Sequence, residues 1–76
     1  MSKLWRPIHH ECVAAEGASE SGGEGRFDVI ENDEGFMIYN GTTGLYETGV
    51  FDTLDLAVAE AQRLADVFDR QNEGPL

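Results

Sequence analysis

The chain has 76 residues and a single cysteine, and its 15 Asp and Glu against five Lys and Arg give a net charge of -10. This length fits one domain with a small core. One cysteine excludes a disulfide within the chain and suits a reducing compartment.

Two further features narrow the class of protein. The sequence has no run of about 18 apolar residues for a membrane span and no long apolar stretch near its start that would indicate a secretory signal. We therefore expect a cytoplasmic protein. The negative charge repels nucleic acid and anionic membranes, so a direct partner of either kind is not expected. The acid excess serves solubility alone or attracts a basic protein surface.

The first third of the chain divides into two segments. Residues 1–13 form an N-terminal arm or an edge strand, since Pro7 is tolerated on sheet edges. Trp5 either fills the core or anchors a partner. Residues 14–25 are small, polar and rich in glycine and serine, with too little apolar surface to offset the entropy of ordering. They are expected to form a flexible acidic loop.

Residues 26–51 predict a three-stranded antiparallel meander. Apolar and polar side chains alternate, and glycine-containing turns separate the strands at 33–35 and 41–44. The side chains predicted to face the core are Phe27, Val29, Phe36, Ile38 and Val50. Met37, Tyr39 and Tyr46 would lie on the opposite, exposed face.

Residues 52–72 predict one amphipathic helix. Its apolar stripe recurs every three or four residues and comprises Leu54, Ala57, Val58, Ala61, Leu64, Ala65 and Phe68. Asp52 or Thr53 would cap the first turn, and Gly74 and Pro75 would end the pattern. The predicted fold class is α+β: an antiparallel sheet of three strands, or four if residues 1–13 join, with the helix packed on one face.

No residue pattern predicts catalysis or a metal site. His9, His10 and Cys12 are zinc-ligand types, but no second cluster completes a tetrahedral set. The acidic neighbours Glu11 and Glu16 oppose the lowered thiol pKa that a nucleophilic cysteine needs. The acidic turn of the meander lacks the spacing of an EF-hand calcium loop. We therefore expect a non-enzymatic protein with no cofactor.

The exposed aromatic and methionine side chains among acids indicate a protein-binding surface. Met37, Tyr39 and Tyr46 would anchor the contact. The acids predicted to meet a basic partner are Glu31, Asp33, Glu34, Glu47, Asp66 and Asp69. The alternative is that the N-terminal segment folds over the three anchors through Trp5.

One stretch of the chain carries a resemblance. Phe51, Thr53, Ala57 and Ala61 fit the pattern F-x-T-x-x-x-A-x-x-x-A, and Glu34-Gly35-Phe36 precedes them. With these residues, 26–66 resemble a small bacterial and phage domain of unknown function, in which two or three strands lead into such a helix. The resemblance implies a fold and no activity, and residues 1–25 do not match it.

The small size, the acidity and the α+β pattern also look like phage-encoded inhibitors of bacterial defence, including anti-CRISPR proteins, which share no common motif. This likeness implies a non-enzymatic inhibitor that occupies a basic surface of a nucleic-acid-binding protein, such as a CRISPR surveillance complex, in the host cytoplasm. The alternative is a small homodimeric structural module with no inhibitor role, whose sheet face or edge strand forms the self-interface.

Overall fold

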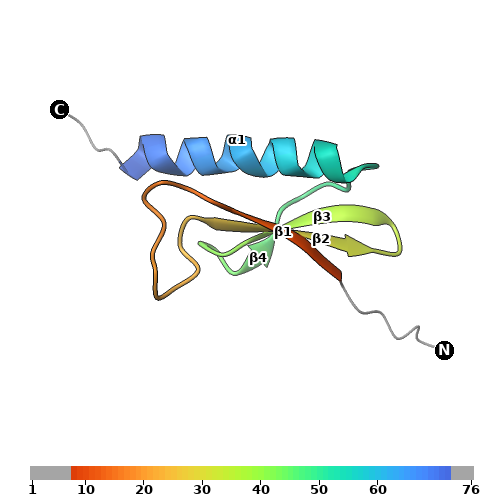
Figure 1. Cartoon of the computed structure of the whole chain (residues 1–76), viewed down its shortest axis with the longest axis horizontal. Helices are drawn as coiled ribbons and strands as arrows, with labels where there is room; N and C mark the ends of the chain where they lie inside the picture. Colours follow the sequence, from red (N-terminus) through yellow and green to blue (C-terminus); the bar gives the residue numbers. More distant parts are fainter. Residues whose placement is uncertain (1–7, 73–76) are drawn as a thin grey trace.

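The protein is an α+β domain with a four-stranded antiparallel sheet and one helix packed on one face (Figure 1). The structure is a computed structural model and describes residues 8–72. The elements are β1 (Ile8–Ala14), β2 (Arg26–Asn32), β3 (Gly35–Asn40), β4 (Leu45–Tyr46) and α1 (Leu54–Asn72), with the strands in the order β1-β2-β3-β4. The predicted fold class is confirmed, and β1 supplies the fourth strand. The alternatives for Trp5 concern a position outside the described residues.

Alternation along the strands places the core between the sheet and α1. Val29 of β2 lies opposite Ile38 of β3, and both side chains are fully buried, as their neighbour Phe27 nearly is. The intervening residues of each strand point to the other face because successive side chains alternate. The buried core consists of Val13, Ala15, Phe27, Val29, Ile38, Ala57, Ala61 and Ala65, with Phe36, Phe51, Leu54, Val58, Leu64 and Phe68 packed around it.

The helix begins at a side-chain cap and packs through small residues. The Thr53 hydroxyl accepts a hydrogen bond from the Leu56 N–H at 3.2 Å, so Thr53 is the N-cap and satisfies a backbone donor of the first turn. Three buried alanines, one turn apart, face the sheet: Ala57, Ala61 and Ala65. Because their side chains are short, α1 can lie close to β1, β2 and β3, on which it packs.

The last predicted strand is much shorter than expected. β4 holds two residues; after it the Glu47 N–H donates to the Ile38 carbonyl at 2.7 Å, and an isolated bridge of Phe36 with Phe51 returns the chain to β3. The prediction that Val50 faces the core is wrong, since Val50 is 43% exposed. Gly49 adopts a φ of 115°, a conformation that favours glycine. It interrupts the strand alternation, so Val50 turns outward while Phe51 packs against the core.

The first hairpin turn, between β2 and β3, is fixed by one side chain. The Asn32 side-chain oxygen Oδ1 accepts the N–H groups of Glu34 at 2.8 Å and of Gly35 at 3.0 Å. Gly35 has a φ of 145°, and a Cβ there would lie 2.7 Å from the Phe51 carbonyl oxygen. Glycine is therefore required both by the backbone conformation and by the close approach of the bridge to β3.

The loop between β1 and β2 is held at its ends by hydrogen bonds. It begins at Ala15, one residue later than predicted, because Ala14 belongs to β1. The Ala15 N–H donates to the Gly25 carbonyl at 2.8 Å. The Arg26 Nε donates to the Ser19 carbonyl at 3.3 Å. The loop therefore folds back on itself beside the C-terminal half of α1.

Candidate functional site

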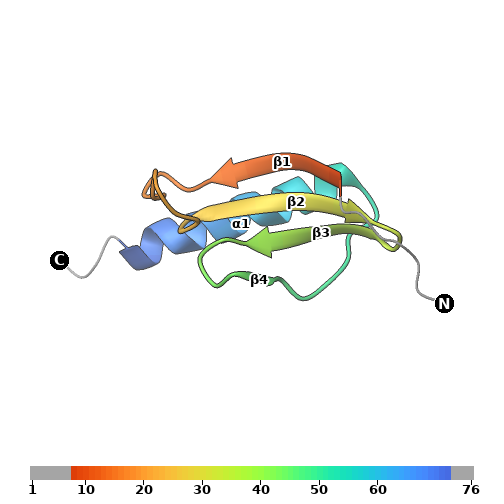
Figure 2. The same ribbon diagram turned by 90° about the horizontal axis from the view of Figure 1, so that it is seen from below.

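The sheet face that points away from α1 is named here the outer face, and Figure 2 views the sheet from this side with the helix behind it. Strand register places side chains of neighbouring strands in rows across it. One row runs from Cys12 through Asp28 and Tyr39 to Tyr46, and a second connects His9, Ile30 and Met37. No helix or strand of residues 8–72 covers this face.

The apolar part of the outer face is built by three side chains that the sequence predicted and by Ile30 beside them. The rings of Tyr39 and Tyr46 meet edge-to-face with centroids 5.2 Å apart, a favourable geometry for aromatic pairs. The Asn32 amide nitrogen lies 2.8 Å from the Met37 sulfur. Tyr46 remains 43% exposed. The two tyrosines and Met37 therefore form an apolar patch that these contacts hold in place and that is accessible to solvent.

The polar part of the outer face lies over β1 and β2. The His9 Nε2 is 3.5 Å from the Asp28 carboxylate. Partial desolvation of the Cys12 sulfur raises the pKa of the thiol above its ordinary value, and the Asp28 carboxylate raises it further, while Arg26 acts in the opposite direction. The thiol is therefore held in its neutral form, which is a poor nucleophile.

Three of the predicted contact acids lie around the tip of the β2–β3 hairpin. Asp33 and Glu34 are exposed in the turn. Glu31 faces the helix side of the sheet, where its carboxylate is 2.8 Å from the His10 Nε2. The His10 ring in turn lies 5.3 Å from the Phe36 ring. Glu31 is therefore directed away from the tyrosines.

The other predicted acids lie on the helix side. Glu47 accepts a hydrogen bond from the Asn40 amide at 2.7 Å. Asp69 of α1 accepts the N–H groups of Glu16 at 3.0 Å and of Gly17 at 2.9 Å. Asp66, one turn earlier on α1, is exposed. The structure thus brings together Met37, Tyr39 and Tyr46 but distributes the six predicted acids over the hairpin tip, the β4 side and the helix.

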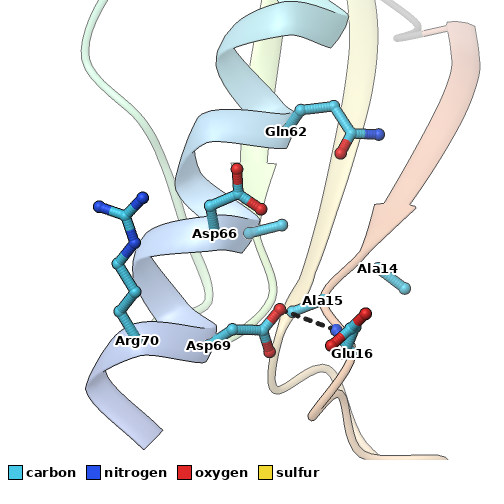
Figure 3. Close-up of a pocket in the computed structure, with 8 residues that line it drawn as sticks. Ala14, Ala15, Glu16, Gln62, Asp66, Asp69 and Arg70 are labelled. Atoms are coloured by element: carbon cyan, nitrogen blue, oxygen red, sulfur yellow. Dashed lines mark hydrogen bonds between the residues drawn. The ribbon is translucent and has the colours of Figure 1, made fainter. Parts of the chain in front are cut away.

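A groove between the C-terminal end of β1 and the C-terminal half of α1 was not predicted from the sequence. Its volume is about 460 Å³, and its lining residues are Ala14, Ala15, Glu16, Gln62, Ala65, Asp66, Asp69 and Arg70. Figure 3 shows the Asp69 carboxylate directed at the Glu16 backbone, while the Arg70 side chain extends away from Ala14 and Ala15. The small side chains at the end of β1 and on α1 leave this space open, and the four-residue spacing of the alanines Ala57, Ala61 and Ala65 was the sequence signal for it.

The structure does not assemble the histidines and the cysteine into a metal site. The register of β1 shifts between His9 and Glu11, and this bulge directs His9 to the outer face and His10 to the helix side. In the part of the chain from 8 to 72, no three His, Cys, Asp or Glu side chains converge as metal ligands. Over the same residues, no helix combines the length and the apolar composition that crossing a bilayer requires.

Comparison with known proteins adds no relative. The chain matches no protein-family model, and neither the curated proteins nor the solved structures give a significant match. Of the resemblance to a small bacterial and phage domain, the structure supports the α+β fold alone.

Proposed function

We propose that this chain is a non-enzymatic protein-binding domain that docks on a basic surface of another protein through the outer face of its sheet. The observation that carries the proposal is the open apolar patch of Met37, Tyr39 and Tyr46 on a face that no described element covers. Tyrosine and methionine are enriched in protein interfaces, where large rigid side chains supply much of the binding energy.

The charge of the domain indicates the kind of partner. Lys3, Arg6 and Glu73 lie outside the described residues, so the described part holds 14 of the 15 acids and three of the five bases. These acids lie at the hairpin tip, in the loop after β1, near β4 and on α1, so the negative field extends over the whole domain and is not confined to the outer face. A field of one sign accelerates encounter with a surface of the opposite sign and weakens as salt increases.

Two features support a function without catalysis. The pKa of the Cys12 thiol is raised by desolvation and by Asp28, the reverse of what activates a cysteine nucleophile. His9 and His10 point to opposite faces and each lies beside a different carboxylate, so they do not share a substrate site.

The more specific form of the proposal is a phage-encoded inhibitor that occupies a nucleic-acid-binding surface of a bacterial defence complex. Its support is the small acidic α+β domain, since a negatively charged surface can compete with nucleic acid for basic side chains. Binding to a purified CRISPR surveillance complex, measured over increasing salt, tests this form. Tight binding at low salt that weakens as salt rises is expected, and absence of binding at low salt would refute it.

A pair of variants tests the outer face for any partner found. Tyr46→Ser removes an anchor, and Leu56→Ser removes a side chain that is also exposed, at 54%, but lies on α1. If Tyr46 is an interface anchor, its loss weakens binding by about 5- to 30-fold, which corresponds to roughly 1–2 kcal/mol. The control variant should bind like the wild type. Equal effects of both variants would exclude the outer face as the docking surface.

The fluorescence of Trp5, the single tryptophan, tests whether the N-terminal segment covers the same face. The proposal predicts that iodide or acrylamide quenches Trp5 equally in the wild type and in Tyr46→Ser. A protected tryptophan that becomes accessible in Tyr46→Ser would instead assign the N-terminal segment as the cover of the outer face.

A homodimeric module is the second candidate, because both the outer face and the β1 edge are open in the described chain. Sedimentation velocity separates the two functions. The binding-domain proposal predicts a monomer, since the charge of -10 opposes self-association. A tight dimer that Tyr46→Ser dissociates would favour the homodimer.

A further inference from the structure

The two edges of the sheet differ in their capacity to accept another strand. β4 is two residues long, too short to template a neighbour, whereas β1 is seven residues long and pairs on one side only, with β2. The bulge at His10 distorts the first half of β1, and bulges of this kind hinder pairing at an edge. The second half, from Glu11 to Ala14, follows a regular register and lies at the open edge (Figure 2).

The hydrogen-bond pattern shows which backbone groups of β1 face outward. The Ala15 N–H donates to the Gly25 carbonyl. The N–H and C=O of Arg26, which lies opposite Ala14, are instead bonded to Gly23 and Gly41. Because hydrogen-bonded and non-bonded pairs alternate in an antiparallel ladder, the N–H and C=O of Ala14 and of Cys12 point to the open side.

The acidic groove lies directly beside this open edge, on the helix side. Ala14, the last residue of β1, and Ala15, the next residue, line it together with Ala65 and Asp66 of α1. In strand pairs, directly opposite residues share a face. A residue of an added strand that lies opposite Val13 or Ala15 would therefore point toward α1 and into the groove.

The charges of the groove select the side chain that such a strand would place there. Glu16 and Asp66 are exposed carboxylates with no hydrogen bond from another side chain among those described, while Asp69 already accepts two backbone N–H groups. The Arg70 side chain extends away from β1 (Figure 3). A long basic side chain entering the groove would meet two carboxylates.

We propose that the second half of β1 accepts an extended basic segment of a partner protein as a fifth strand, with an Arg or Lys side chain in the groove between β1 and α1. The added strand bonds to the outward N–H and C=O of Cys12 and Ala14. Its register places basic residues at alternate positions, opposite Val13 and Ala15. This surface is separate from the outer face, so the strand-addition proposal can be correct or wrong independently of the function proposed above.

The probe is a short capped peptide that alternates Arg and Val, added to the whole ¹⁵N-labelled chain and followed by NMR. Two control peptides have the same length: one alternates Glu and Val, and one contains the same Arg and Val residues in two blocks. The expected result is saturable shifts of the amides of Cys12, Ala14, Ala65 and Asp66, with slowed solvent exchange of the Cys12 and Ala14 N–H groups. The block peptide should bind more weakly, and the Glu peptide should not bind.

Matched variants test each half of the proposal. Ala14→Pro removes an outward N–H and leaves the ladder to β2 intact, so peptide affinity should fall by about 2- to 10-fold, the equivalent of one hydrogen bond. Asp66→Asn should weaken binding by up to about fivefold, as expected of a surface ion pair. Asp55→Asn, an equally exposed position near the start of α1, should leave affinity unchanged.

Three results would overturn the proposal. The first is equal binding of the alternating and block peptides, which would indicate attraction by net charge alone. The second is equal loss of affinity in Asp66→Asn and Asp55→Asn, or shifts confined to other acidic segments. The third is absence of peptide binding, or exchange protection of the Cys12 and Ala14 amides in the free chain through pairing with a second copy.

Discussion

Replacing Ala61 by leucine tests most sharply how α1 packs on the sheet. Ala61 is fully buried in the cluster that contains Val29 and Ile38. The added atoms have no free space, so the helix must shift or side chains must leave their preferred rotamers, at a cost of about 1–3 kcal/mol. A domain of this length has a total stability of roughly 4–11 kcal/mol, so the loss is a large fraction of it.

The matched control is Ala59→Leu, which makes the same chemical change at an exposed position of the same helix. Alanine and leucine have similar helix propensities, so this variant should differ from the wild type by less than about 0.5 kcal/mol. Urea unfolding followed by far-UV circular dichroism measures the stability of both variants. In thermal unfolding, each kcal/mol of lost stability should lower the melting temperature by about 4–8 °C. If Ala61→Leu is as stable as Ala59→Leu, then α1 does not pack closely on the sheet at Ala61.

Three further predictions concern the polar contacts of α1. Thr53→Ala removes the N-cap and should cost about 0.5–2 kcal/mol in urea unfolding, with no loss as the contradicting result. Asp69→Ala removes the acceptor of two loop N–H groups; it should cost about 1–3 kcal/mol and accelerate hydrogen exchange in the loop after β1, and unchanged exchange would show that this contact does not hold the loop. The Arg63 guanidinium holds the pKa of Glu60 below its ordinary value of 4.5. The ion pair therefore stabilises the fold above the ordinary pKa, and this stabilisation is lost as the pH falls through the lowered pKa of the folded state. Arg63→Ala should return the Glu60 pKa toward its ordinary value in an NMR titration, and an unchanged titration would refute the pairing.

The elements with a clear period were predictable from the sequence. Alternation in β2 and β3 assigned Phe27, Val29 and Ile38 to the core and Met37 and Tyr39 to the outer face, because a strand has a side-chain period of two. The helix stripe was predictable for the same reason at its period of 3.6. Gly49 shows where this reasoning fails. Its positive φ ended the alternation in a stretch whose composition still indicated a strand.

The grouping of side chains from distant segments was not predictable. Asp69 and Glu16 are far apart in the chain, and only the packing of α1 beside β1 brings them together. The bulge in β1 separates His9 from His10, and nothing in the sequence marks it. For this reason the acids predicted as one contact set lie at three places, and the groove beside β1 became visible only in the folded chain.

Site-specific photo-crosslinking in the cells that produce the protein tests the central claim most directly. A photoreactive phenylalanine analogue is placed either at Tyr46, on the outer face, or at Leu56, on the exposed side of α1. The proposal predicts a covalent adduct with a basic protein from position 46 that is lost at high salt, and no such adduct from position 56. Equal adducts from both positions, or an adduct from position 46 with a second copy of this chain alone, would contradict it.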